Sequence, residues 1–287
     1  MSAKKTARRS IARRKMTDAV MRVVAAAAAL LGVFFLAWIL LVVFRRGLEG
    51  ADLAFFTELP TPPGIEGGGL GNAILGTFLM TAIAAVIGVP LGLMGGVFLS
   101  EYARSGILGD LIRFSSNLMM GIPSIIVGLF VYTLVVLPMG SFSGMAGAVS
   151  LAIIMFPVAL RTTEDMLSMV PNELREAALA LGAPRWRTTL EIVFRAARTG
   201  LVTGVLLAVA RVSGETAPLL FTALNSDYWP TGFLNAPTAN LTVTITNYAL
   251  SPYADWNRIA WRAALLITLA VLLMNITARV FTWERSK

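Results

Sequence analysis

The stretch PNELREAALALGAPRWRTTLEIVFRAAR, from Pro171 to Arg198, is the longest polar passage between two apolar segments of the chain. Its first half predicts a short helix, because Pro171 lacks only an N–H that a first turn does not use and no β-branched residue follows. Gly182 can adopt the left-handed conformation that ends a helix, and Pro184 cannot continue it. We therefore expect a helix–turn–helix that restarts near Trp186.

The first of these helices has an apolar face. Its members recur at i, i+3, i+4 and i+7: Leu174, Ala177, Ala178 and Leu181. Glu173 and Arg187 remain available to water. The hairpin thus offers a small apolar patch, although an ordinary amphipathic cytosolic loop would show the same pattern.

Composition assigns the chain to the membrane proteins. Of its 287 residues, 56% are hydrophobic and 14% are charged, and the mean hydropathy is +0.74. The net charge is +8, but the basic residues gather in the N-terminal tail and between apolar segments, where lipid headgroups and topology explain them without nucleic acid. With no Cys and no His, disulfides, thiol nucleophiles, imidazole bases and the usual zinc sites are excluded. We expect no enzymatic site, no metal and no bound cofactor.

The hydropathy pattern predicts an all-α membrane protein with six spanning helices. Residues 1–21 are expected to form a basic, disordered cytoplasmic tail, and residues 22–44 the first span, about 33 Å long at ~1.5 Å per residue. This span is too long for a cleaved signal peptide. Residues 282–287 are expected to form a cytoplasmic C-terminal tail. The other spans are predicted near residues 72–99, 111–137, 143–160, 201–224 and 260–281.

Two spans carry backbone signals. In the second, small residues recur every four positions, which lets helices pack closely in lipid; they include Gly76, Gly88, Gly92 and Gly96. In the third, Gly121, Pro123 and Ser124 interrupt the helix, and irregular backbone at membrane depth persists only where protein packs it or where it lines a wet cavity. These three residues are a candidate pore-lining kink, with a plain packing kink as the alternative.

The fifth predicted span contains ARVSGETAP, from Ala210 to Pro218. Arg211 and Glu215 each cost about 2.5 to 3.5 kcal/mol on insertion scales, so they should face the bundle interior, a partner or water. At i and i+4 they are expected to share a helix face, with Ser213 and Thr216 adding hydroxyls. This set predicts an oxyanion station, with a purely structural ion pair as the alternative.

An even number of spans places both termini on one side, and the basic tail predicts that this side is the cytoplasm. The arginines of the 171–198 hairpin agree with this topology. Arg45 and Arg46 fall on the outside and count against it, but the tail has more basic residues.

Glu176-Ala177-Ala178, Gly182 and Ile192 resemble the EAA loop of the membrane subunits of bacterial ATP-binding-cassette importers. The family continues with Leu-Pro where this chain has Phe194 and Arg195, so the second helix is expected to run on unbroken. The segments GIPSIIVGLF and ARVSGETAPLLFTA narrow the resemblance, which covers residue 72 to the C-terminus, to the A-type membrane subunits of phosphate importers.

This resemblance implies a type I importer permease fold over residues 72–281 in the bacterial inner membrane. The implied partners are a homologous second permease, two copies of an ATPase subunit that hold ATP and Mg, and an extracytoplasmic phosphate-binding protein, with a cytoplasmic regulatory subunit left open. The 171–198 loop would couple to the ATPase through Arg175, Glu176, Ala177, Ala178 and Gly182.

Arg211 and Glu215 match an arginine and a glutamate that the family uses in phosphate passage. We expect Arg211 to attract the anion and Glu215 to accept a hydrogen bond from a protonated phosphate oxygen, which sulfate lacks at neutral pH. Arg161 is a second pathway candidate, although a basic residue at a span end commonly reaches for lipid headgroups.

Three alternatives stay open. The same architecture could carry sulfate, molybdate or a phosphonate, or the chain could be a secondary transporter or channel that needs no ATPase. A membrane-bound enzyme would require a carboxylate cluster within the spans, and the sequence shows none. The sequence also has no GxxxxGK[ST] motif, so ATP hydrolysis would have to come from another chain.

Overall fold

The computed structural model describes residues 2–50, 52–65 and 67–283, and in this part the chain forms helices joined by loops, with no strand. The first half contains α1 (Ser2–Leu48), α2 (Ala54–Thr57), α3 (Gly71–Val97), the π-helix η1 (Phe98–Tyr102), α4 (Ile107–Gly121), α5 (Ser124–Val131), η2 (Tyr132–Val136), α6 (Leu137–Met139) and α7 (Gly144–Ser168). The second half contains α8 (Asn172–Ala180), α9 (Arg185–Arg187), the π-helix η3 (Thr188–Val193), α10 (Phe194–Val212), α11 (Ala217–Leu220), α12 (Leu241–Ala249) and α13 (Ala254–Trp283).

Within the described residues, five helical segments are long and apolar enough to cross a membrane: Arg14–Leu48, Gly71–Tyr102, Gly144–Ser168, Arg185–Val212 and Ala254–Val280. A sixth crossing results if Ile107–Gly121 and Ser124–Met139, which are bent by 100°, are counted as one broken span. The predicted all-α membrane fold is confirmed, and the third span breaks at the residues that the sequence indicated.

Close packing of α3 on α7 forms the centre of the bundle. Gly88 and Gly92 leave no room for a side chain, since a Cβ on Gly92 would lie 2.5 Å from the Cβ of Ala159. Around this contact lies a core of fully buried side chains that includes Met80, Leu151 and Met155. The small residues predicted along one face of the second span therefore serve helix packing in lipid.

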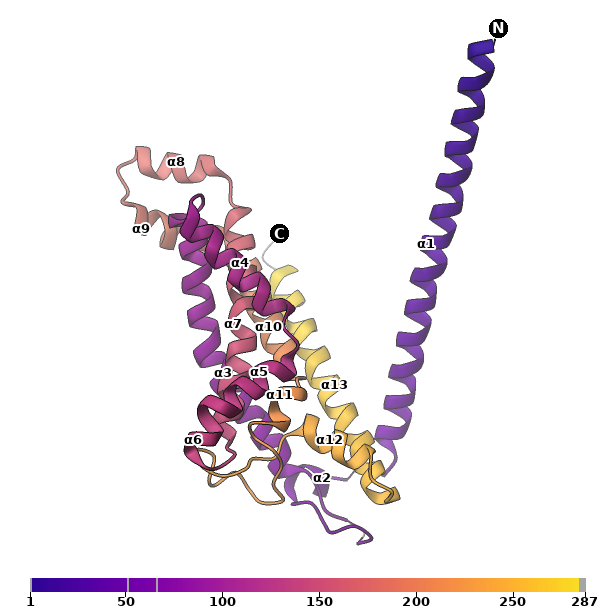
Figure 1. Cartoon of the computed structure of the whole chain (residues 1–287), viewed down its shortest axis with the longest axis vertical. Coiled ribbons are helices and arrows are strands. Elements are labelled where there is room, and N and C mark those ends of the chain that lie inside the picture. Colours follow the sequence, from indigo (N-terminus) through magenta and orange to yellow (C-terminus); the bar gives the residue numbers. More distant parts are fainter. Residues whose placement is uncertain (1, 51, 66, 284–287) are drawn as a thin grey trace.

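Helix α1 stands apart from the bundle and approaches it only near its own C-terminal end, beside α13 (Figure 1). There Gly47 lies against Leu265 and Trp261. The expectation of a disordered tail over residues 1–21 is wrong for residues 2–21, which continue the helix of the first span. Extending an existing helix costs far less free energy than starting one, so the polar residues 2–21 can extend the helix of the apolar span toward the N-terminus.

The fifth span begins and ends earlier than predicted, since it runs from Arg185 to Val212. Helix α10 ends at Val212 rather than at residue 224, because Gly214 and Pro218 interrupt the helical hydrogen bonding that follows. The connection between the predicted spans at residues 201–224 and 260–281 contains α12 and the start of α13. Figure 1 places the N-terminal end of α1, the C-terminal end and the α8–α9 hairpin at the same end of the molecule, and α2 and α12 at the other.

Candidate functional site

The first part of the candidate site is the break between α10 and α11. Residues Ser213 to Thr216 leave the helix, and the Ser213 hydroxyl donates to the Ala210 carbonyl at 2.8 Å. The Glu215 carbonyl accepts a hydrogen bond from the Thr242 hydroxyl of α12, also at 2.8 Å. The break is therefore held by α12, a segment far away in the sequence.

Arg211 and Glu215 lie on opposite sides of the helix end. The expectation that they share one helix face is wrong, because α10 ends between them. Arg211 is exposed and Glu215 is partly exposed. Within the described residues no ion pair joins Arg211 to Glu215 or to another carboxylate. The structure thus offers no support for the alternative of a structural ion pair, and both charged groups stay at least partly exposed at the helix break.

An open groove of about 460 Å³ begins at this break and runs between α12 and α13. Hydroxyl groups of four threonines line it among apolar side chains: Thr216, Thr242, Thr246 and Thr268. The Thr246 and Thr268 hydroxyls donate to carbonyls of their own helices, at 3.0 and 2.7 Å. Their oxygens keep lone pairs that can accept a further hydrogen bond. Thr216 was predicted from the sequence. Thr242 and Thr246 were missed because no helix was expected between the fifth and sixth spans, and Thr268 was missed because nothing in the sequence marks the face of the sixth span that meets this groove.

The predicted kink of the third span contributes the second interrupted element. Ile122 and Pro123 are extended, Gly121 and Pro123 are exposed, and Ser124 is half-buried at the start of α5. Gly128 of α5 lies directly on α11, since a Cβ there would be 2.6 Å from the Cα of Pro218. The two breaks therefore belong to segments that touch. Interrupted helices that meet inside a bundle are a common way to build an ion site in a membrane.

Arg161 belongs to a different region. Its guanidinium pairs with Glu164 at 3.2 Å and with Asp165 at 3.3 Å, so its charge is already compensated. Its neighbour Thr162 lies against Gly204 of α10, and Arg211 is seven residues further along that helix, about 10 Å at ~1.5 Å per residue. The structure does not bring the two arginines together.

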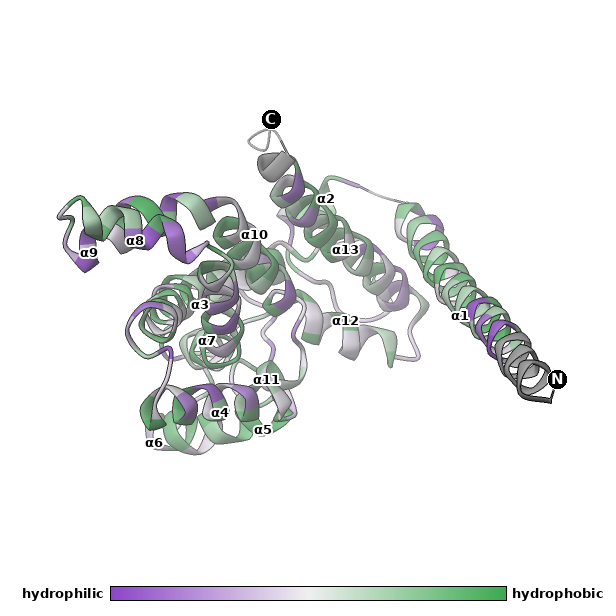
Figure 2. Cartoon of the chain, turned by 90° about the horizontal axis from the view of Figure 1, so that it is seen from above, coloured by the Kyte–Doolittle hydropathy of each residue, from purple (hydrophilic) through white to green (hydrophobic). Residues whose placement is uncertain are grey.

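The hairpin forms as the sequence predicts. Helix α8 is followed by a turn in which Gly182 has φ of +82°, and the chain restarts at Arg185 after Pro184. The restarted helix runs unbroken from Arg185 to Val212, as expected from Phe194 and Arg195. In the view from above, α8 and α9 project to one side of the bundle (Figure 2).

The predicted coupling residues divide into two groups. Glu176, Ala177 and Gly182 are exposed, and so are Leu174 and Leu181 of the predicted apolar patch. Ala178 and Arg175 are buried instead. The hairpin therefore leaves an apolar and acidic face uncovered, while its other face is anchored to the bundle.

Arg175 provides this anchor. Its guanidinium pairs with Glu101 of η1 at 2.8 Å and donates to the carbonyls of Val170 and Leu167 at 2.6 and 2.7 Å. Both charged side chains are 9% exposed. Sequence reasoning missed Glu101; its only signal was a single carboxylate at the end of an apolar span.

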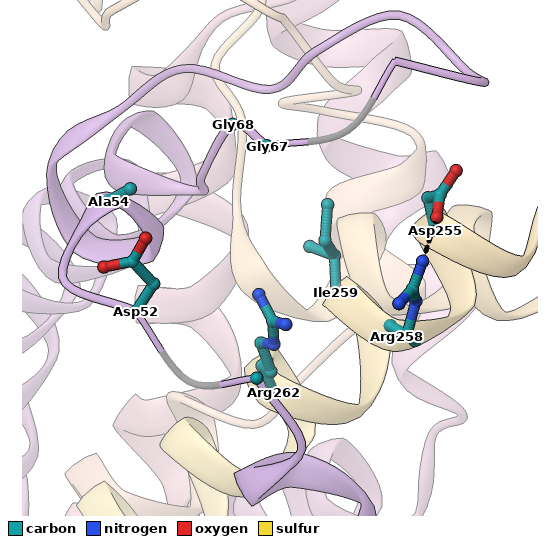
Figure 3. A pocket seen from close by; sticks show the side chains of 9 residues that line it. Asp52, Ala54, Gly67, Gly68, Asp255, Arg258, Ile259 and Arg262 are labelled. Atoms are coloured by element: carbon teal, nitrogen blue, oxygen red, sulfur yellow. Dashed lines mark hydrogen bonds and ion pairs between the residues drawn. The ribbon is translucent and has the colours of Figure 1, made fainter.

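A pocket of about 260 Å³ lies at the opposite end of the molecule, between the loop that follows α1 and the start of α13 (Figure 3). Arg258 forms an ion pair with Asp255, and Arg262 donates to the Glu49 carbonyl at 3.1 Å. Asp52 faces the same space. These contacts hold the end of α1 against α13, and nothing links them to the helix breaks.

Two interrupted spanning helices that touch, a cation without a carboxylate partner in the described part of the chain, and a hairpin outside the bundle define a helical membrane transport component. Residues 88–282 match the family described as "Binding-protein-dependent transport system inner membrane component". The chain is 50% identical over 273 residues to the phosphate transport system permease protein PstA of Yersinia pestis, with 95% of this chain and 92% of that protein covered. It is 47% identical over 275 residues to PstA of Pasteurella multocida, with 96% and 97% covered. The chain therefore belongs to the PstA family of transport permeases.

Solved structures share the fold at lower identity. A bacterial alginate ABC transporter, in complex with an alginate-bound periplasmic protein, has a chain that matches with a TM-score of 0.65 at 14% identity and covers 95% of this chain and 96% of its own. The MetNI methionine ABC transporter matches with a TM-score of 0.60 at 21% identity, covering 74% and 94%. These likenesses establish the importer permease fold.

Proposed function

We propose that this chain is the membrane-spanning permease subunit of an ATP-driven phosphate importer in the bacterial inner membrane, with both termini in the cytoplasm. The observation that carries the proposal is the identity of 50% over 95% of the chain to a phosphate transport permease. The chain would form half of the pathway with a homologous second permease. An extracytoplasmic binding protein would deliver phosphate, and two ATPase subunits would hold ATP and Mg.

The exposed face of α8 supports the docking of an ATPase. Helix α8 projects from the bundle (Figure 2). Leu181 at its end is 89% exposed, and Glu176 and Ala177 of the same helix are exposed as well. A soluble partner would cover these apolar side chains and thereby gain hydrophobic free energy. Because α9 and η3 continue directly into α10, movement of the hairpin would reach the end of that helix at Arg211.

The α10–α11 break supports an oxyanion as the transported substrate. Arg211 can donate charge-assisted hydrogen bonds to an anionic oxygen. Glu215 can accept a hydrogen bond from a phosphate that still carries a proton, and it would repel an anion that carries none. As the ion moves, threonine oxygens of the adjoining groove would accept hydrogen bonds from a phosphate oxygen that carries a proton.

Transport by the reconstituted complex tests the proposal. Proteoliposomes that contain both permeases and the ATPases, with binding protein outside and ATP inside, should accumulate labelled phosphate, and excess sulfate should not compete. Equal competition by sulfate, molybdate or a phosphonate would overturn the assignment of phosphate as the specific substrate. Liposomes with this chain alone should take up no phosphate; uptake there would favour a secondary transporter or channel.

A further inference from the structure

The Glu101–Arg175 pair joins the hairpin to the end of the second span. Besides the 2.8 Å contact, the Arg175 Nε donates to Glu101 Oε2 at 3.2 Å, so the guanidinium presents two nitrogens to one carboxylate. Such a fork has a defined geometry and resists rotation. Removal of either partner leaves a buried charge without compensation. Helix α8 and η1 are therefore expected to move together.

The same guanidinium also closes the end of α7. Its bonds to the carbonyls of Leu167 and Val170 satisfy acceptors that a helix C-terminus leaves open. Arg104 adds a second link, since it donates to the Asn172 side chain at 2.8 Å and to the Ser100 carbonyl at 2.5 Å. The hairpin is thus fixed to the η1 turn at two points.

Helix α4 also contacts the η1 turn. Arg113 donates to the carbonyls of Leu99 and Ala103, at 3.3 and 3.1 Å, and these residues flank Glu101 in the sequence. It also pairs with Glu164 of α7 at 2.6 Å. The far end of α4 is Gly121, where the third span breaks. Figure 1 shows α4 extending from the hairpin end of the bundle toward α5.

Two routes therefore lead from the hairpin to the centre of the bundle. One is the continuous helix from Arg185 to Val212, which reaches α11. The other passes through Arg175, Glu101, the η1 turn and Arg113 into α4 and α5. The routes meet where Gly128 touches Pro218.

We propose that the Glu101–Arg175 pair couples movement of the hairpin to the broken third span, and that Glu101 is a positioning residue for transport. This rests on the proposed function. Without the pair, the hairpin would still move α10 and α11, but α4 and α5 would no longer follow. The α4–α5 and α10–α11 breaks would then no longer move together, and ATP would be hydrolysed without delivery of the ion.

The test compares uptake with ATP hydrolysis in the reconstituted complex. For Glu101→Gln and Arg175→Lys, we expect phosphate uptake to fall about tenfold while ATP hydrolysis stays within about twofold of the wild type. Glu191→Gln is the matched control: its carboxylate lies in the same hairpin, is 61% exposed and pairs with Arg187 at 3.4 Å. It should leave both rates unchanged.

A second measurement follows the movement itself. The chain has no cysteine, so spin labels can be placed at Ala180 of α8 and Gly121 at the break. A third label on α13 serves as the reference. Addition of ATP with vanadate should change the distance between the labels at Gly121 and α13 in the wild type but not in Glu101→Gln. The distance between the labels at Ala180 and α13 should change in both proteins.

Three results separate the possible failures. A wild-type ratio of uptake to hydrolysis in both variants would overturn the coupling role. A parallel loss of assembly, hydrolysis and uptake would also overturn it, because the pair would then only support the fold. A wild-type complex that hydrolyses ATP without moving phosphate would instead overturn the proposed function.

Discussion

The two charged regions of this chain are built in opposite ways. At the hairpin end, buried charges are matched: Arg175 meets Glu101, and Arg113 meets Glu164. At the α10–α11 break, Arg211 has no carboxylate partner within the described residues. Charges removed from water must be compensated, so the buried pairs hold a shape. The exposed Arg211 guanidinium instead keeps its hydrogen-bond donors available to an anion from outside the chain. The first region is suited to transmitting movement and the second to receiving an anion.

The largest expected effect is at Arg211. Arg211→Gln should lower phosphate uptake about 100-fold, corresponding to ~2.7 kcal/mol, because the break would lose its cation. The measurement is labelled phosphate uptake by proteoliposomes at matched levels of assembled complex. Arg161→Gln is the comparison, and we expect a loss within about fivefold because Glu164 and Asp165 already neutralise that guanidinium. Equal losses in the two variants would break the contrast between the regions.

Glu164 tests the matched cluster. Glu164→Gln should reduce the stability of the chain by roughly 3 kcal/mol, since Arg113 and Arg161 would lose a shared carboxylate that is 8% exposed. Thermal unfolding in detergent measures this loss. Asp165→Asn removes a carboxylate that is 49% exposed and pairs with one arginine, so it should cost ~0.5 kcal/mol. Similar shifts in unfolding temperature for both variants would show that burial does not determine how much each carboxylate of the cluster contributes to stability.

Two glycines compare the packed contact between α3 and α7 with the open break of the third span. Gly92→Ala should cost about 1 to 2 kcal/mol, because its Cβ would lie 2.5 Å from the Ala159 Cβ and 2.9 Å from the Leu160 nitrogen. Gly121→Ala adds the same methyl group where no atom lies within 4 Å, and it should be neutral. Unfolding temperatures of the two variants give the comparison, and a neutral Gly92→Ala would contradict the close packing of α3 on α7.

The smallest effect is expected at Thr242. Thr242→Val removes the hydrogen bond to the Glu215 carbonyl and should cost ~1 kcal/mol, with uptake reduced about fivefold. Thr203→Val is the control, because that hydroxyl donates to the Thr199 carbonyl within α10 and does not line the groove. Comparable uptake in the two variants would mean that the Thr242 contact does not position Glu215.

Local chemistry explains which expectations were confirmed. The turn at Gly182, the restart after Pro184 and the break at Pro123 follow from backbone properties of single residues. The end of the fifth span was misplaced because an apolar run continues past Val212, and hydropathy does not register a lost helical hydrogen bond. The tail of α1 was misjudged for the opposite reason, since its polar composition hid its continuity with an apolar helix.

The sequence by itself determined the membrane class, the broken third span, the hairpin and the two charged groups near Gly214, because each depends on composition or on the conformation of adjacent residues. Only the tertiary structure decided which charges are matched. Arg175, predicted to face a partner, turns inward because the distant Glu101 and the carbonyls of Leu167 and Val170 at the end of α7 surround it. Arg211 remains unmatched because α10 ends before Glu215 can join it on one face. Pairing of charges depends on contacts between helices, which periodicity along one helix does not contain.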